Sequence, residues 1–236
     1  MCITMKKYLF SLAVILCLVG CQRAEYAADK LAASNPIMPI RMMSDTTHIV
    51  LTDYLPSLYG DTSLWKGLQW TAGDAIECLN LVGTPQVVRE MDIVNRDRSI
   101  HAFTLSDKSG SLAIPILPNK PVRQALVSLG YENGLLQVGF VGEVTNPSFE
   151  AYFQNYLIDH DLWSTNEDGS WTLDLKGLPV SGEGLRGRTF IRIYAEDDSY
   201  LYNDLLLPMQ DGEIITDAAM LNRHDQQAQV LYSLMI

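Results

Sequence analysis

Short apolar runs separated by turn residues recur along most of the chain. Their length and their content of β-branched and aromatic residues are typical of strands. Turn signals such as Asn133-Gly134 separate many of them, and a spacing of about 8 to 15 residues favours antiparallel β-sandwiches. The pattern therefore predicts an all-β fold of two immunoglobulin-like antiparallel sandwiches. The runs occupy residues 47–51, 75–82, 112–117, 125–129, 135–141, 171–175 and 189–195.

A proline-rich stretch at residues 115–121 offers the best division of the chain. Prolines this dense cannot donate a ladder of hydrogen bonds, so they suit an edge strand or a linker. We therefore expect one sandwich over residues 36–120 and a second over residues 121–218. Residues 146–156 leave the element type open, because Pro147 suits the first turn of a short helix but the segment also fits a strand.

The first residues have the pattern of an export signal. Lys6 and Lys7 precede an apolar run over residues 8–19, which is too short to span a bilayer as a helix of about 20 residues. The run ends in Gly20-Cys21, which resembles the lipobox of bacterial lipoproteins. An ordinary signal peptide that ends in a chance cysteine is the alternative, and Met5 is a second candidate start.

The lipobox resemblance implies an anchored protein. Residues 1–20 are then a signal peptide that is cut before Cys21, and residues 21–35 are a tether that begins at the lipidated Cys21. Several acyl chains on Cys21 give stable binding to a lipid bilayer, which one chain does not. We expect a lipoprotein of the cell envelope, with the outer membrane favoured and exposure at the cell surface open.

Charge and cysteine content narrow the partners. The formal net charge of −11 should repel nucleic acid and anionic lipid headgroups, which leaves sugars, cations or proteins. Processing before Cys21 leaves Cys78 as the one unmodified cysteine, so we expect no internal disulfide. Cys78 lies in an apolar run and is expected to be a buried small hydrophobic residue.

No sequence motif indicates a cofactor or a metal ion, and we expect neither. The four histidines are scattered. Gly182-x-Gly184-x-x-Gly187 precedes a strand instead of opening a helix, which argues against a dinucleotide site. Residues 196–198, Glu-Asp-Asp, have the carboxylates for calcium, but adjacent side chains point in different directions, so a solvated turn is the expectation.

The tryptophans are candidate carbohydrate-binding residues. Exposed aromatic rings stack on the C–H faces of sugars, whereas sandwich cores also bury tryptophan, and the sequence leaves both interpretations open. The candidates are Trp65, Trp70, Trp163 and Trp171.

The order of segments in the C-terminal quarter resembles a junction in Bacteroidetes enzymes of the α-amylase family, glycoside hydrolase family 13. In those enzymes, N-terminal β-sandwich domains precede the catalytic barrel. Segments 49–56 and 67–74 also resemble the first accessory domain of that family, and 142–147 and 154–156 the second. The C-terminal segments are residues 190–195, 202–209, 212–217, 221–225 and 230–236.

The resemblance implies that residues 219–236 are a linker and the first strand of a catalytic barrel. The catalytic carboxylates of the family lie on later barrel strands and have no counterpart here, so we expect no catalytic residue. The expected function is the non-catalytic N-terminal portion of a membrane-anchored hydrolase that acts on α-glucan such as starch. This portion would position the barrel and bind glycan. A free-standing surface glycan-binding lipoprotein and a structural or protein-interaction spacer are the alternatives, between which fold alone does not choose.

Overall fold

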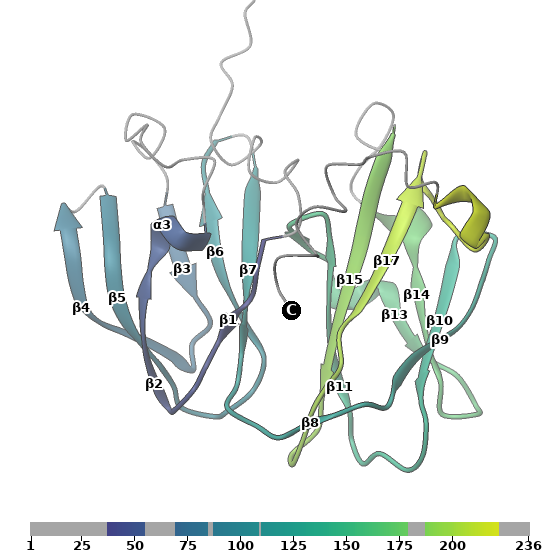
Figure 1. Ribbon diagram of the computed structural model, residues 1–236, viewed down its shortest axis with the longest axis horizontal. Coiled ribbons are helices and arrows are strands. Elements are labelled where there is room, and N and C mark those ends of the chain that lie inside the picture. Colours follow the sequence, from purple (N-terminus) through teal and green to yellow (C-terminus); the bar gives the residue numbers. More distant parts are fainter. Residues whose placement is uncertain (1–36, 55–68, 85–86, 109, 179–186, 222–236) are drawn as a thin grey trace, which may run out of the picture.

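The computed structural model of this protein describes residues 37–54, 69–84, 87–108, 110–178 and 187–221 (Figure 1). Several sequence predictions lie outside these ranges. They are the signal peptide, Cys21 and its tether, Trp65, the glycines at 182 and 184, and the expected barrel strand at 230–236.

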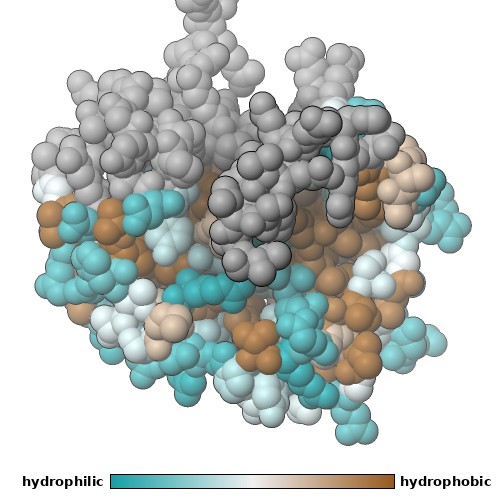
Figure 2. Space-filling model, in the orientation of Figure 1, coloured by the Kyte–Doolittle hydropathy of each residue, from teal (hydrophilic) through white to brown (hydrophobic). Residues whose placement is uncertain are grey.

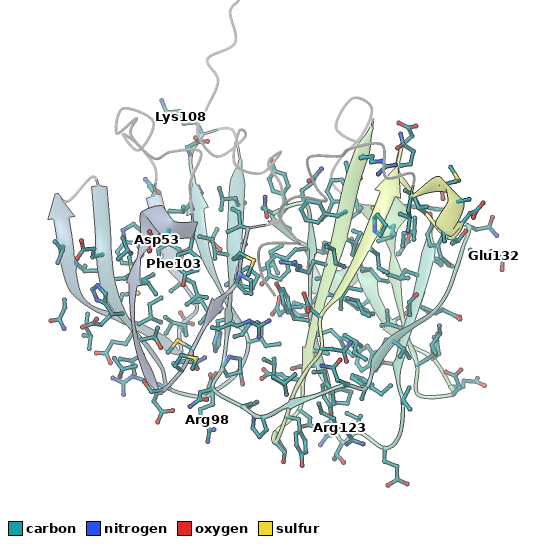
Figure 3. The ribbon with its side chains drawn as sticks, viewed as in Figure 1. Asp53, Arg98, Phe103, Lys108, Arg123 and Glu132 are labelled. Atoms are coloured by element: carbon teal, nitrogen blue, oxygen red, sulfur yellow. The ribbon has the colours of Figure 1, made fainter. Side chains whose placement is uncertain are left out.

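The first half of the described chain forms a sandwich of two sheets, which occupies the left of Figure 1. Its core lies between the sheets, where Met91 and Ile93 from one sheet meet Phe103 and Ile114 from the other, all 0% exposed. Figure 3 shows Phe103 inside this sandwich. One sheet has the order β1 (Ile40–Arg41), β7 (Ser111–Leu117), β6 (His101–Ser106), β3 (Gln69–Ala72), and the other β2 (Thr46–Val50), β5 (Val87–Asn95), β4 (Ile76–Thr84), with the one-turn helix α3 (Leu51–Tyr54) after β2.

The second half forms another sandwich, on the right of Figure 1. Its inner sheet faces the first sandwich and contains β12 (Tyr156–Leu157), β11 (Ser148–Phe153), β15 (Arg188–Glu196), β16 (Leu201–Tyr202), β8 (Val122–Arg123), β17 (Leu205–Gln210) and β18 (Glu213–Ile214). Its outer sheet has the order β13 (Trp163–Thr165), β14 (Trp171–Asp174), β10 (Leu135–Phe140), β9 (Leu126–Glu132). Short 3₁₀ helices cover His160–Leu162, Leu175–Gly177 and Ala218–Met220.

The predicted all-β sandwich fold is confirmed, and the Asn133-Gly134 turn shows why the sequence predicted it. Asn133 and Gly134 have φ values of 51° and 78° and connect β9 to β10. Positive φ at both central residues gives a turn whose twist matches that of the flanking strands, and asparagine and glycine adopt it at least cost.

Two local expectations are settled by the backbone. Residues 148–153, for which helix and strand were both open, form strand β11. Pro115 lies inside β7, opposite Ala102, and not in a linker. It is tolerated because β1 pairs only with Ile116 and Leu117, so the ladder on that side of β7 begins just past the proline.

The described surface is mixed in character. Figure 2 shows hydrophilic side chains over much of the first sandwich and larger hydrophobic areas on the side of the second. Among the described residues, no helix is long and apolar enough to cross a lipid bilayer.

Phe149 is the aromatic centre of the second core, and its replacement tests that packing. Its ring lies 5.5 Å from Phe140, 5.1 Å from Trp163 and 5.0 Å from Trp171, measured between centroids. Phe149→Ala should lower the free energy of unfolding by about 3–5 kcal/mol in urea titrations, because the substitution removes all three ring contacts and leaves a cavity. Leu79→Ala, at a side chain 40% exposed, should change it by less than about 0.5 kcal/mol. Equal effects of the two variants would contradict this packing.

Candidate functional site

Part of the inner sheet of the second sandwich, β11 and the end of β15, is covered on both faces. Ile191 and Ile193 of β15 point into the second core. Tyr194, the next residue along β15, points the other way and packs with Tyr152 against the first sandwich. A strand buried on both sides has no solvent-facing row of side chains, so the two sandwiches share an apolar interface. The first sandwich contributes Ile100, Ala113 and Leu117 to it.

Glu196 at the end of β15 links the two sandwiches through a hydrogen bond and an ion pair. It is 3% exposed, and its Oε1 accepts a hydrogen bond from the backbone N–H of Ile100 at 2.6 Å. Its Oε2 lies 2.8 Å from Nζ of Lys120, in the connection between the sandwiches. Lys120 Nζ also donates to the backbone oxygen of Asp197 at 2.8 Å. These added hydrogen bonds offset part of the cost of taking both charges out of water.

The expectation of a solvated turn at residues 196–198 is therefore wrong for Glu196. It holds for Asp198, which is exposed. Asp197 organises the turn, since its Oδ1 accepts the N–H groups of Ser199 at 2.8 Å and Tyr200 at 2.7 Å. Sequence reasoning missed Glu196 because its partner Lys120 lies 76 residues earlier in the chain.

A second set of polar contacts fastens another part of the interface. The backbone oxygen of Asn155 accepts from the N–H of Ala113 in β7 at 2.7 Å. Its side-chain Oδ1 accepts from the N–H of Ile37 at 3.0 Å. Arg192 Nη1 of β15 donates to the backbone oxygen of Ile37 at 3.4 Å. Groups from both sandwiches thus satisfy each other across the contact, as buried polar groups require.

Glu150 on β11 is the least well satisfied acid near the interface. Its side chain is 19% exposed, and within the described ranges its Oε2 is buried without a hydrogen-bond partner. Its Oε1 lies 3.3 Å from Nε2 of His160. Burial raises the pKa of the Glu150 carboxyl group, and the neighbouring His160 offsets part of that rise.

The three tryptophans inside the described ranges are half-buried and pack on the cores. Trp70 stacks on Phe103 at 5.6 Å between centroids, and Trp163 and Trp171 both contact Phe149. The structure does not bring Trp70 together with the other two, since it belongs to the other sandwich. Carbohydrate binding by these residues and by Trp65 stays a prediction.

Two hollows lie beside the outer sheet of the second sandwich. One, of about 640 Å³, is lined by Gly139, Phe140, Ser170 and Trp171 among others. The other, of about 750 Å³, is lined mainly by polar or small residues. Both volumes are in the range of ligand sites, about 300–1,000 Å³. The lining of the second consists of Gly130, Tyr131, Glu132, Asn133, Leu135, Gln137, Ser164, Asn166, Thr172 and Asp174.

Other reactive groups form no constellation in the described part of the chain. No group of three histidine, cysteine, aspartate or glutamate side chains is placed there to hold a metal ion. Cys78 is half-buried against the first core, and burial raises the pKa of its thiol. It therefore packs as a small hydrophobic residue with less thiolate than a free cysteine has.

Comparisons with known proteins do not assign this chain to a family. No protein-family model and no curated protein matches the sequence. Domains 5–6 of the S-layer protein SbsC align over 75% of this chain and 94% of theirs at 9% identity, with a TM-score of 0.24. The FN1–FN3 domains of chicken CNTN1 align over 78% and 70% at 8% identity, with a TM-score of 0.23. Likenesses this weak carry no argument about function.

A double-mutant cycle tests the buried ion pair. Lys120→Met and Glu196→Gln should each lower the free energy of unfolding by about 3–5 kcal/mol, because each leaves one buried charge unpaired. The double variant should lose clearly less than the sum, because neither charge then remains. In the control, Glu77→Gln removes the exposed partner of Arg96 and should cost less than about 1 kcal/mol. Additive losses in urea titrations would contradict the pairing.

Glu150 predicts a dependence of stability on pH. Because its folded-state pKa is raised, the carboxyl group favours folding while protonated, and this contribution is lost as pH rises through the folded-state pKa. Glu150→Gln should therefore be more stable than the original chain near neutral pH. The two free energies of unfolding should converge as pH falls below the ordinary glutamate value of 4.5. A difference that stays constant between pH 4 and pH 7 would refute the assignment.

Proposed function

We propose that this chain is a non-catalytic pair of β-sandwiches that serves as a rigid spacer. The interface carries this proposal. Glu196 and Lys120 are buried between the sandwiches at 4% and 8% side-chain exposure, and Tyr152, Tyr194 and Leu201 exclude water beside them. Motion between the two sandwiches would separate the buried charges and leave each one without its partner, which is costly. The buried pair therefore supports a connection that holds both sandwiches in one relative position.

The finer role that we propose is the accessory region of a membrane-anchored glycoside hydrolase that acts on α-glucan. The resemblance of segments 190–195 and 202–209 to the α-amylase-family junction supports it, together with the lipobox ending at Cys21. In that role the lipid on Cys21 holds the chain at a membrane of the cell envelope, and the two sandwiches set the distance from the membrane to a catalytic domain.

Distances between spin labels test the spacer role. In a chain whose four native cysteines are replaced by alanine, labels are attached at Asp45→Cys and Glu132→Cys. Both positions are exposed, one in each sandwich, and Figure 3 shows Glu132 at the edge of the second sandwich far from the first. Pulsed dipolar spectroscopy should give one narrow distance distribution, because the interface holds the sandwiches in one orientation.

A labelled pair within one sandwich sets the reference width for this measurement. Glu132→Cys with Asp161→Cys places both labels in the second sandwich, at exposed positions. The distribution across the interface should be about as narrow as this one. A much broader or multiple distribution across the interface would reject the rigid spacer.

A further inference from the structure

A row of small and polar residues crosses the whole outer sheet of the second sandwich. Gly130 pairs with Gln137, Gln137 with Thr172, and Thr172 with Ser164, so the row takes one residue from each of β9, β10, β14 and β13. All four line the same hollow of about 750 Å³. The next residues along β10 and β14 point into the core, because Leu136, Val138 and Leu173 are 0% exposed. The row therefore faces away from the core and forms the floor of an open groove.

Gly130 and a β-bulge shape the floor of this groove. Gly130 has no side chain, and Gln137 lies over it, since a Cβ on Gly130 would stand 4.0 Å from Gln137 Oε1. Further along β10, Gly139 continues the floor into the neighbouring hollow of about 640 Å³. The pairing of β9 with β10 shifts register between Gln137 and Val138, which bends the sheet at this point. The hollow of about 640 Å³ also borders Val144, Asn146 and Pro147, in the connection between β10 and β11, so it lies at the end of the sheet.

The groove offers amide groups for hydrogen bonding. Gln137 is exposed, and its side-chain amide has no hydrogen-bond partner among the described residues. Asn166 is held in place, since its Nδ2 donates to Ser170 Oγ at 2.8 Å and to Thr172 Oγ1 at 3.0 Å. An unpaired amide both donates and accepts, so Gln137 can bind neighbouring hydroxyl groups of a ligand. Both Nδ2 hydrogens of Asn166 are already bonded and its Oδ1 accepts from Thr172 Oγ1 at 3.2 Å, so Asn166 offers a ligand only the remaining acceptor position of Oδ1. Asn166 loses little freedom on binding because it is already oriented.

Charge restricts the ligand further. The lining of the two hollows includes Glu132, Asp168 and Asp174, and no lysine or arginine is part of it in the described chain. Such a groove repels anionic polymers. A peptide cannot add to this face as a strand, because the backbone groups of β10 and β14 already pair with their neighbours. Trp171 and Phe140 line the other hollow, but their half-buried rings pack on Phe149 in the core.

We propose that the face of the outer sheet lined by Gly130, Gln137, Ser164 and Thr172 binds a neutral polysaccharide chain. Hydroxyl groups of the polysaccharide exchange hydrogen bonds with the amide of Gln137 and donate to Oδ1 of Asn166, and the polysaccharide lies across the hollow of about 750 Å³. This site uses amides and hydroxyl groups as its contacts. It does not depend on the spacer role, because all of its residues belong to the second sandwich.

Isothermal titration calorimetry on the full chain tests this site with four probes. Amylopectin and galactomannan are neutral, polygalacturonate is anionic and polylysine is cationic. At least one neutral polysaccharide should bind, and more tightly than either charged polymer. Gln137→Ala should weaken that binding about tenfold, as expected for the loss of a hydrogen-bonding amide at the centre of the groove. Its melting temperature should not change, because the side chain is exposed.

Gln69→Ala is the matched control, since Gln69 is an exposed strand glutamine in the first sandwich. It should bind the neutral polysaccharide as the original chain does. The proposal is overturned if neither neutral polysaccharide binds, if a charged polymer binds more tightly, or if Gln137→Ala binds as well as Gln69→Ala. The spin-label distances remain a separate result, because a rigid interface without polysaccharide binding rejects this site alone.

Discussion

Glu196 is a carboxylate at 3% exposure, and the arrangement of the two sandwiches depends on its partners. Lys120 comes from the connection, Ile100 from the first sandwich, and Glu196 itself from β15 in the second. Neither sandwich alone supplies all three groups. A buried charge without its partner is expensive, so separating the sandwiches means hydrating both charges and exposing the surrounding Tyr152 and Tyr194. The buried ion pair therefore favours one fixed orientation of the two sandwiches relative to each other.

This orientation decides which surfaces remain available. In the inner sheet of the second sandwich, β11 and the end of β15 are covered on one face by their own core and on the other by the first sandwich, whereas Leu206 of β17 is 48% exposed. The outer sheet of the second sandwich keeps one open face, and that face contains the polar row and the hollow of about 750 Å³. A rigid pair therefore presents the groove at a fixed distance and direction from the first sandwich. The spacer role and the binding site are compatible but separate properties.

The sequence predicted strands rich in apolar residues, such as β7, whose apolar run is nearly continuous, and the Asn133-Gly134 turn. It did not single out β5 or β6, because their buried residues alternate with polar ones, as Met91 and Ile93 do with Asp92. The interface was beyond sequence reasoning, since Glu196 and Lys120 meet only after both sandwiches fold. The groove was missed for a similar reason. Gly130, Gln137, Ser164 and Thr172 form a row only through strand register, and none carries a motif.

Amide nitrogen-15 relaxation measures most directly whether the two sandwiches move as one body. The ratio of longitudinal to transverse relaxation times gives the rotational correlation time for each group of amides. If the interface at Glu196 is rigid, amides of β5 to β7 and amides of β9 to β15 will fit one overall rotational diffusion tensor. Two distinct tensors, with a shorter correlation time for each sandwich than for the whole chain, would contradict a rigid pair and the central role given to Glu196.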